Sequence, residues 1–125
     1  MKVFVSGATG TVGREVCAAL HERDVQVRVG ARASSDVASL LPEVSDLVSL
    51  DFAEPEISPS VFDEADAFFF MTPLIEDQVE ASNRVLGAAI EAGVRHIVRL
   101  SSRSAGWDQH SELRAWHREI DDAVR

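Results

Sequence analysis

The chain has 125 residues, of which 46% are hydrophobic and 26% charged, so it can bury a core of its own as one domain. Its formal net charge of -9 argues against a nucleic-acid partner and against adsorption on an anionic membrane, because both need a basic surface. The single cysteine excludes an internal disulfide, no spacing suggests a metal site, and no stretch resembles a signal peptide or a membrane span. We therefore expect a cytoplasmic protein.

Short runs rich in β-branched residues alternate with segments of helical period, which is typical of βαβ units and a parallel sheet. The first strand is expected at residues 3–5, and a helix follows three glycines and runs to about Arg23. The second strand covers residues 25–29, and a weak helix at 35–41 stops at a proline. The third strand covers residues 46–50.

The second half of the chain repeats this alternation. An apolar run at 67–71 predicts a central strand covered by helices on both faces. A helix at 76–92 ends at Gly93, a fifth strand covers 96–100, and a last helix covers 111–124. We predict one α/β domain over residues 1–125. It has a Rossmann-type, doubly wound parallel sheet of about five strands, helices on both faces, and a ligand crevice at the carboxyl ends of the strands.

Three glycines between the first strand and its helix carry the main functional signal. Gly7 allows a tight turn, Gly10 lets the backbone approach a pyrophosphate, and Gly13 lets helix and strand pack closely. The N–H groups of the first helical turn and the helix dipole then face the anion. Glycines also mark such turns for steric reasons alone, but the strand, helix and second strand around them are typical of a dinucleotide site. The predicted binding residues of this turn are Gly7, Thr9, Gly10, Thr11, Val12 and Gly13.

The end of the second strand indicates which dinucleotide binds. NAD sites usually place an Asp or Glu about 20 residues after the glycines, where it accepts a hydrogen bond from the ribose 2′-hydroxyl. Here no carboxylate occurs between the second strand and Asp36, whereas Arg32 can pair with a 2′-phosphate and Ser34 and Ser35 can donate to it. The alternative interpretation is that Arg32 is a solvated cation on the surface. The pattern favours NADP(H) over NAD(H).

With these segments in hand, the chain resembles the NmrA-like, atypical branch of the short-chain dehydrogenase/reductase superfamily. The matching segments are residues 5–13, 29–32, 50–52, 65–67, 71–73, 92–98 and 100–102. The resemblance implies further cofactor contacts at the carboxyl ends of strands: Asp51 and Phe52 at the adenine, Met71, Thr72 and Pro73 at the nicotinamide ribose, and Ser101 and Ser102 near the nicotinamide. Ser101 and Ser102 are alternatively a turn or helix-capping pair.

The chain departs from that superfamily in two ways. Tyrosine-dependent members use a Tyr-x-x-x-Lys pair, but this chain has no tyrosine and its only lysine is Lys2, so that mechanism is excluded. The remaining catalytic candidates are Ser101, Ser102 and His117. Relatives also continue into a sixth strand and a smaller lobe over the substrate, which this chain lacks. The uncovered sheet edge invites pairing with a second copy or a protein partner.

Two functions follow from these observations. The first is an NADPH-dependent oxidoreductase that passes hydride to a small electrophilic acceptor such as a quinone or an enone. The second is a non-catalytic module that senses NADP(H) and binds a protein partner. The resemblance favours the first function, and the missing tyrosine and substrate lobe favour the second.

Overall fold

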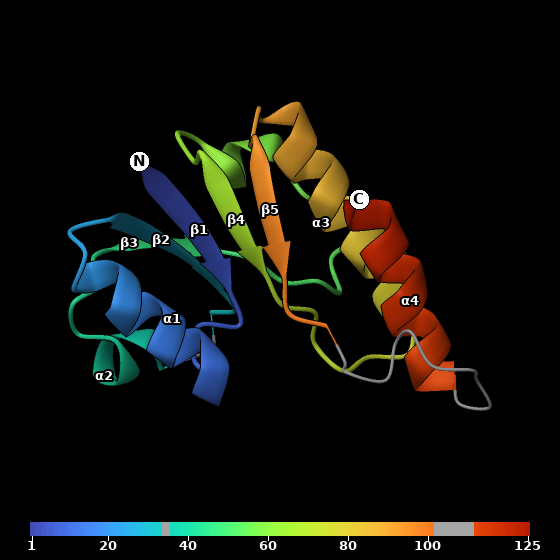
Figure 1. Ribbon diagram of the computed structural model, residues 1–125, viewed down its shortest axis with the longest axis horizontal. Coiled ribbons are helices and arrows are strands. Elements are labelled where there is room, and N and C mark those ends of the chain that lie inside the picture. Colours follow the sequence, from blue (N-terminus) through green and yellow to red (C-terminus); the bar gives the residue numbers. More distant parts are fainter. Residues whose placement is uncertain (34–35, 102–111) are drawn as a thin grey trace.

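The computed structural model describes residues 1–33, 36–101 and 112–125 (Figure 1). The strands in these residues are β1 (Lys2–Ser6), β2 (Gln26–Ala31), β3 (Asp46–Ser49), β4 (Ala67–Phe70) and β5 (His96–Arg99). The helices are α1 (Thr11–His21), α2 (Val37–Leu40), α3 (Gln78–Glu91), α4 (Glu112–Val124) and the short 3-10 helix η1 (Pro59–Phe62). Every strand and helix expected from the sequence is therefore present. The predicted starts of two helices, at residues 35 and 111, lie outside the described residues.

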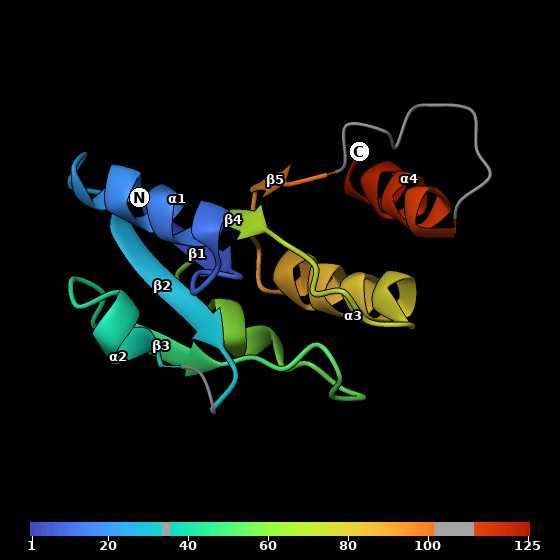
Figure 2. The same ribbon diagram turned by 90° about the horizontal axis from the view of Figure 1, so that it is seen from below.

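The five strands form one parallel sheet in the order β3-β2-β1-β4-β5. The chain moves outward from β1 to β3, then returns to the other side of β1 for β4, so the order reverses between β1 and β4. Figure 2 shows α1 and α2 on one face of the sheet and α3 and α4 on the other. This is the doubly wound Rossmann arrangement that the sequence predicts. No helix among the described residues is long and apolar enough to cross a membrane.

Each face of the sheet has its own apolar core. Alternate residues of a strand point to opposite faces, so Phe4, Phe68 and Phe70 pack against α3 while Val5 and Val29 pack against α1. The rings of Phe4 and Phe68 meet edge to face, with 5.3 Å between centroids. The larger core therefore lies on the α3 side.

Strand β4 corrects one expectation. The sequence predicts a strand covered by helices on both faces, and Phe68 and Phe70 are indeed buried against α3. On the opposite face Phe69 is only half-buried, and its neighbour Val98 on β5 is 61% exposed. Helices α1 and α2 are the described helices on this face, and they pack mainly on β1 and β2 rather than on β5. An apolar run in the sequence does not show whether helices cover one face of the strand or both.

Several expected strands end one residue early. Leu50, Met71 and Leu100 fall just outside β3, β4 and β5. The N–H groups of Leu50 and Leu100 still donate to the neighbouring strands, to Ala31 and Phe70, both at 3.0 Å. The strand ends are thus aligned along one edge of the sheet, and this edge carries the candidate site.

Candidate functional site

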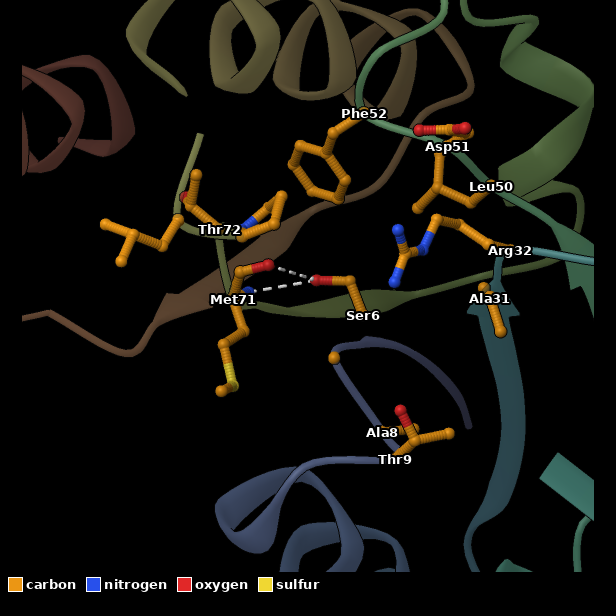
Figure 3. Close-up of a pocket in the computed structure, with 14 residues that line it drawn as sticks. Ser6, Ala8, Thr9, Ala31, Arg32, Leu50, Asp51, Phe52, Met71 and Thr72 are labelled. Atoms are coloured by element: carbon orange, nitrogen blue, oxygen red, sulfur yellow. Dashed lines mark hydrogen bonds between the residues drawn. The ribbon is translucent and has the colours of Figure 1, made fainter. Parts of the chain in front are cut away.

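A pocket of about 320 Å³ lies at the carboxyl ends of β1 to β4, where the strand order reverses (Figure 3). In open α/β sheets this crevice is where ligands bind, because the loops diverge there to opposite faces. The lining comes from the segments that follow four strands: Ser6, Gly7, Ala8 and Thr9; Gly30, Ala31 and Arg32; Leu50, Asp51 and Phe52; and Met71, Thr72, Pro73 and Leu74.

Each glycine of the turn has a different structural reason. Gly7 has φ +68°, a left-handed conformation that favours glycine. A Cβ on Gly13 would lie 2.1 Å from the carbonyl oxygen of Gly7, so only glycine allows this approach of α1 to the turn. A Cβ on Gly10 would meet the Gly7 oxygen at 3.4 Å and a Met71 methyl at 3.8 Å, which are ordinary contacts. Packing within the protein therefore explains Gly7 and Gly13 but leaves Gly10 to a ligand.

The amino terminus of α1 has the features of an anion-binding helix end. Gly10 is its N-cap residue, no side chain caps the helix, and its first turn carries no acidic residue. The Gly10 N–H itself donates to the Gly7 carbonyl at 3.1 Å, which closes the turn. Within the described part of the chain, no acidic side chain thus caps the free N–H groups and the positive dipole end of this 11-residue helix.

A buried serine ties the two strands at the point where the order reverses. Ser6 Oγ donates to the Met71 carbonyl at 3.0 Å and accepts from the Met71 N–H at 2.9 Å (Figure 3). Ser6 is only 1% exposed, so both bonds are shielded from water. This pair fixes the backbone of Met71 next to the glycine turn. The sequence analysis did not single out Ser6, because its partner is 65 residues away.

Arg32 supplies the positive charge of the pocket. Its side chain extends from the end of β2 into the pocket (Figure 3). Within the described part of the chain it makes no hydrogen bond or ion pair. The Asp51 carboxylate on the same wall accepts from the Ala53 N–H at 2.9 Å. An arginine without a carboxylate partner in a pocket can bind an anionic ligand group.

The pocket brings together many of the residues expected from the sequence. Eight predicted cofactor-binding residues line it: Gly7, Thr9, Arg32, Asp51, Phe52, Met71, Thr72 and Pro73. Four others form the start of α1 or the residue before it rather than the pocket wall: Gly10, Thr11, Val12 and Gly13. The predicted residues Ser34, Ser35 and Ser102 lie outside the described residues. Lining residues that the sequence analysis missed are the immediate neighbours of these segments, such as Ser6, Gly30 and Leu50.

Ser101 does not line this pocket, although it follows the next strand, β5. Its hydroxyl instead donates to Asp121 Oδ2 at 2.6 Å, on α4. His117, on the same helix, accepts at Nδ1 from Arg99 Nη2 at 2.9 Å. The two catalytic candidates in the described residues therefore belong to one polar cluster with Arg99 and Asp121.

The described residues contain few other candidates for a metal site or a reactive side chain. Among them, no group of three or more His, Cys, Asp or Glu side chains is arranged to hold a metal ion. Cys17 is fully buried in α1, and burial, followed by the charge of Glu43, raises the pKa of its thiol to about 11. Cys17 is thus an inert core residue at neutral pH.

The fold and the pocket define a Rossmann-type α/β protein with a site at the switch point of its sheet. More particularly, the chain belongs to the NAD(P)H-binding family, whose family model matches residues 7–124. It is 29% identical to the NAD(P)H azoreductase of Xenophilus azovorans over 123 residues, which are 98% of this chain and 43% of that protein.

Solved structures agree with the fold. Triphenylmethane reductase of Citrobacter sp., complexed with NADP(H), matches with a TM-score of 0.85 at 23% identity, over 100% of this chain and 45% of that one. The NADPH-dependent quinone oxidoreductase of Escherichia coli, complexed with NADPH, matches with a TM-score of 0.84 at 19% identity. That match covers 98% of this chain and 44% of the other. The chain thus spans a little under half the length of these relatives.

Proposed function

We propose that the chain binds NADP(H) in preference to NAD(H), as the cofactor module of a reductase for small electrophilic acceptors. The observation that carries this proposal is Arg32, a cation in the pocket beside the glycine turn that has no hydrogen-bond or ion-pair partner among the described residues. The family assignment supports binding of a dinucleotide in general. We further propose that the chain belongs to the NmrA-like branch of that family, and that residues 1–125 act as one domain in the cytoplasm.

The residues of the pocket fit a dinucleotide phosphate. The uncapped start of α1 and the free space beside Gly10 suit the pyrophosphate, since a Cβ at Gly10 would stand where the ligand approaches. Arg32 would pair with a 2′-phosphate on the adenosine ribose. Asp51 and Phe52 would flank the adenine, and Met71, whose backbone Ser6 holds, would lie by the nicotinamide ribose.

Bound NADPH would supply a hydride, and the protein's part is to bind, orient and shield. The chain has no tyrosine, so no Tyr-x-x-x-Lys pair protonates the acceptor. The relatives support acceptors that are small and electrophilic: their names specify an azoreductase, a triphenylmethane dye reductase and a quinone oxidoreductase. We propose a quinone or enone as the acceptor.

The first test is calorimetric titration with NADPH and, separately, NADH. We expect tighter binding of NADPH, and Arg32→Ala should weaken it by about 10- to 100-fold, which corresponds to the loss of a charged hydrogen bond. NADH binding should change by less than about twofold, because NADH lacks the 2′-phosphate. Arg125→Ala is the matched control, since it removes the same charge from an exposed residue at the chain end. Equal weakening of both dinucleotides by Arg32→Ala would contradict the assignment.

The non-catalytic alternative has one observation in its favour. Among the described residues, the side chains lining the pocket include no histidine, cysteine or lysine, and the one carboxylate, that of Asp51, accepts from the Ala53 N–H. A sensing module must bind oxidised and reduced cofactor with different affinity, because a ligand shifts a state only through differential binding. Its partner, or a second copy of the chain, would dock at β5, an edge strand with the exposed Val98. Unequal affinities for NADP⁺ and NADPH without turnover of any acceptor would favour this alternative.

A further inference from the structure

Four polar side chains meet where β5 ends and α4 packs beside it. Arg99 forms an ion pair with Asp121 Oδ1, Ser101 Oγ donates to Asp121 Oδ2 at 2.6 Å, and Arg99 Nη2 contacts His117 Nδ1 at 2.9 Å. The Arg99 side chain is only 3% exposed and that of Asp121 19%. We call these four residues the β5–α4 cluster. The sequence indicated Ser101 and His117 but gave no reason to choose Arg99 or Asp121.

The cluster lies at the same carboxyl edge of the sheet as the candidate cofactor pocket. Arg99 pairs with Phe70 of β4 in the sheet, and the Leu100 N–H donates to the Phe70 carbonyl at 3.0 Å. Ser101 follows directly on Leu100, and Thr72, two residues after Phe70, lines the pocket. Ser101 therefore stands at the same carboxyl edge as the pocket, one strand further along.

The arginine fixes the tautomer of His117. A guanidinium has only donors, so His117 Nδ1 must accept from Arg99 and carries no proton of its own. The single proton of a neutral imidazole then sits on Nε2. Burial, followed by the charge of Arg99, lowers the pKa of His117, against the opposing effect of Asp121. His117 is consequently neutral at physiological pH and presents an N–H donor.

The Asp121 carboxylate fixes the direction of the Ser101 hydrogen bond in the same way. A serine hydroxyl has one proton, and Ser101 donates it to Asp121 at 2.6 Å, a length typical of a charge-assisted bond. What Ser101 offers a ligand is therefore its lone pairs. The Arg99 guanidinium on the other carboxylate oxygen balances the charge of Asp121, which keeps this arrangement stable in a partly buried position.

We propose that Arg99 and Asp121 are positioning residues that make Ser101 a hydrogen-bond acceptor and His117 a donor through Nε2, so that neither supplies a proton to a bound acceptor. This inference rests on the proposed reductase function. A structural brace between β5 and α4 would require only the Arg99–Asp121 pair. The alignment of Ser101 and His117 on opposite ends of that pair is what a brace does not explain.

The proposal restricts the class of acceptor. The electron pair of the hydride would form the new bond to an electrophilic atom of the acceptor, and the π pair displaced there would move to a terminal oxygen. A bound dinucleotide would thereby be oxidised, and the resulting anion would take its proton from water. A quinone accommodates this sequence because its reduced monoanion is stabilised by the aromatic ring. A simple aldehyde or ketone would give an alkoxide, which needs a protein acid in the same step. We therefore expect quinone or enone acceptors, and no reduction of simple aldehydes or saturated ketones.

The decisive experiment is ¹⁵N NMR of the histidine imidazoles in the full chain, with the His117 signal assigned by its loss in His117→Gln. We expect His117 as the Nε2–H tautomer at neutral pH. In Arg99→Gln its protonation midpoint should rise, because the repelling charge is gone. In Asp121→Asn it should fall, because the favourable charge is gone. Arg99 from β5 and Asp121 from α4 are the charged groups that act on His117 among the described residues.

Opposite shifts of the His117 midpoint in Arg99→Gln and Asp121→Asn would distinguish positioning from general destabilisation, because destabilisation would shift the midpoint in the same direction in both variants. A proton on Nδ1, or shifts of the same sign, would overturn the proposal. If Arg99→Gln does not fold, Arg99→Lys keeps the charge, and there the midpoint should stay close to that of the wild type. These measurements need no cofactor, so a failure of NADPH binding would contradict the proposed function but not this assignment.

Steady-state kinetics with NADPH and a naphthoquinone provide the second arm. His117→Gln should raise the quinone KM by up to about 10-fold, the effect of one lost hydrogen bond. Ser101→Ala should change the quinone KM less, because Ser101 is an acceptor and a quinone carbonyl has no proton to donate to it. Both variants should leave kcat within about threefold. A fall in kcat of about 100-fold or more in either variant is the effect of losing a general acid, and it would overturn the proposal.

Discussion

Replacing Gly13 by alanine tests the packing that shapes the glycine turn. The new Cβ would lie 2.1 Å from the Gly7 carbonyl oxygen and 2.7 Å from Ala8 Cα, where tight contacts begin near 3.4 Å. Both are backbone atoms, so no rotamer change relieves the contact and α1 must retreat by more than 1 Å. Such overpacking costs about 3 kcal/mol, at the upper end of the usual range. Alanine returns about 1 kcal/mol through its helix propensity, so we expect Gly13→Ala to lower the free energy of unfolding by about 2 kcal/mol.

Gly87→Ala is the matched control. Gly87 lies within α3, and a Cβ there would meet nothing within 4 Å, so we expect a gain of about 1 kcal/mol from helix propensity alone. Urea denaturation followed by circular dichroism gives both values, and NADPH titration gives the functional effect. Gly13→Ala should lose most NADPH binding, because the start of α1 moves away from the ligand, while Gly87→Ala should bind like the wild type. A Gly13→Ala protein as stable as the wild type would refute the steric argument.

Three further outcomes follow from buried and ion-paired groups. Ser6→Ala leaves the Met71 N–H and carbonyl without their shared partner, and urea denaturation should show a loss of about 1–3 kcal/mol; a loss below about 0.5 kcal/mol would show that the strand ends are tied by other contacts. Cys17, with a pKa of about 11 and no exposed surface, should react with a thiol reagent only as fast as the chain unfolds, and rapid labelling of the native protein would contradict its burial. The Lys2 backbone N–H, followed by Arg95, holds the pKa of Asp66 below its usual range, so this carboxylate stabilises the fold above about pH 4 and the contribution is lost as pH falls through the lowered pKa. The stability difference between the wild type and Asp66→Asn should accordingly be present at pH 7 and shrink in strong acid, and a difference that stays constant with pH would exclude this role.

The patterns that lie within single segments of the chain determined the fold class and the glycine turn of the candidate site. Strands and helices alternate with period-2 and helical patterns that each segment carries within itself, and right-handed crossovers then leave few arrangements of the sheet. The spacing of Gly7, Gly10 and Gly13 is equally local, because one strand, the turn after it and the start of the next helix determine it. Arg32 could be predicted from the sequence for the same reason, since it follows directly on the second strand.

Tertiary structure decided what depends on residues far apart in the chain. Ser6 meets Met71 across 65 positions, and Ser101 meets Asp121 across 20, so neither pair leaves a pattern that one segment shows. The half-covered face of β4 has the same origin: Phe69 is as apolar as Phe68, and only the placement of α1 and α3 distinguishes them. Local spacing specifies backbone conformation, whereas side-chain partners and burial arise only when distant segments pack together. For that reason the glycine turn could be assigned from the sequence, and the β5–α4 cluster could not.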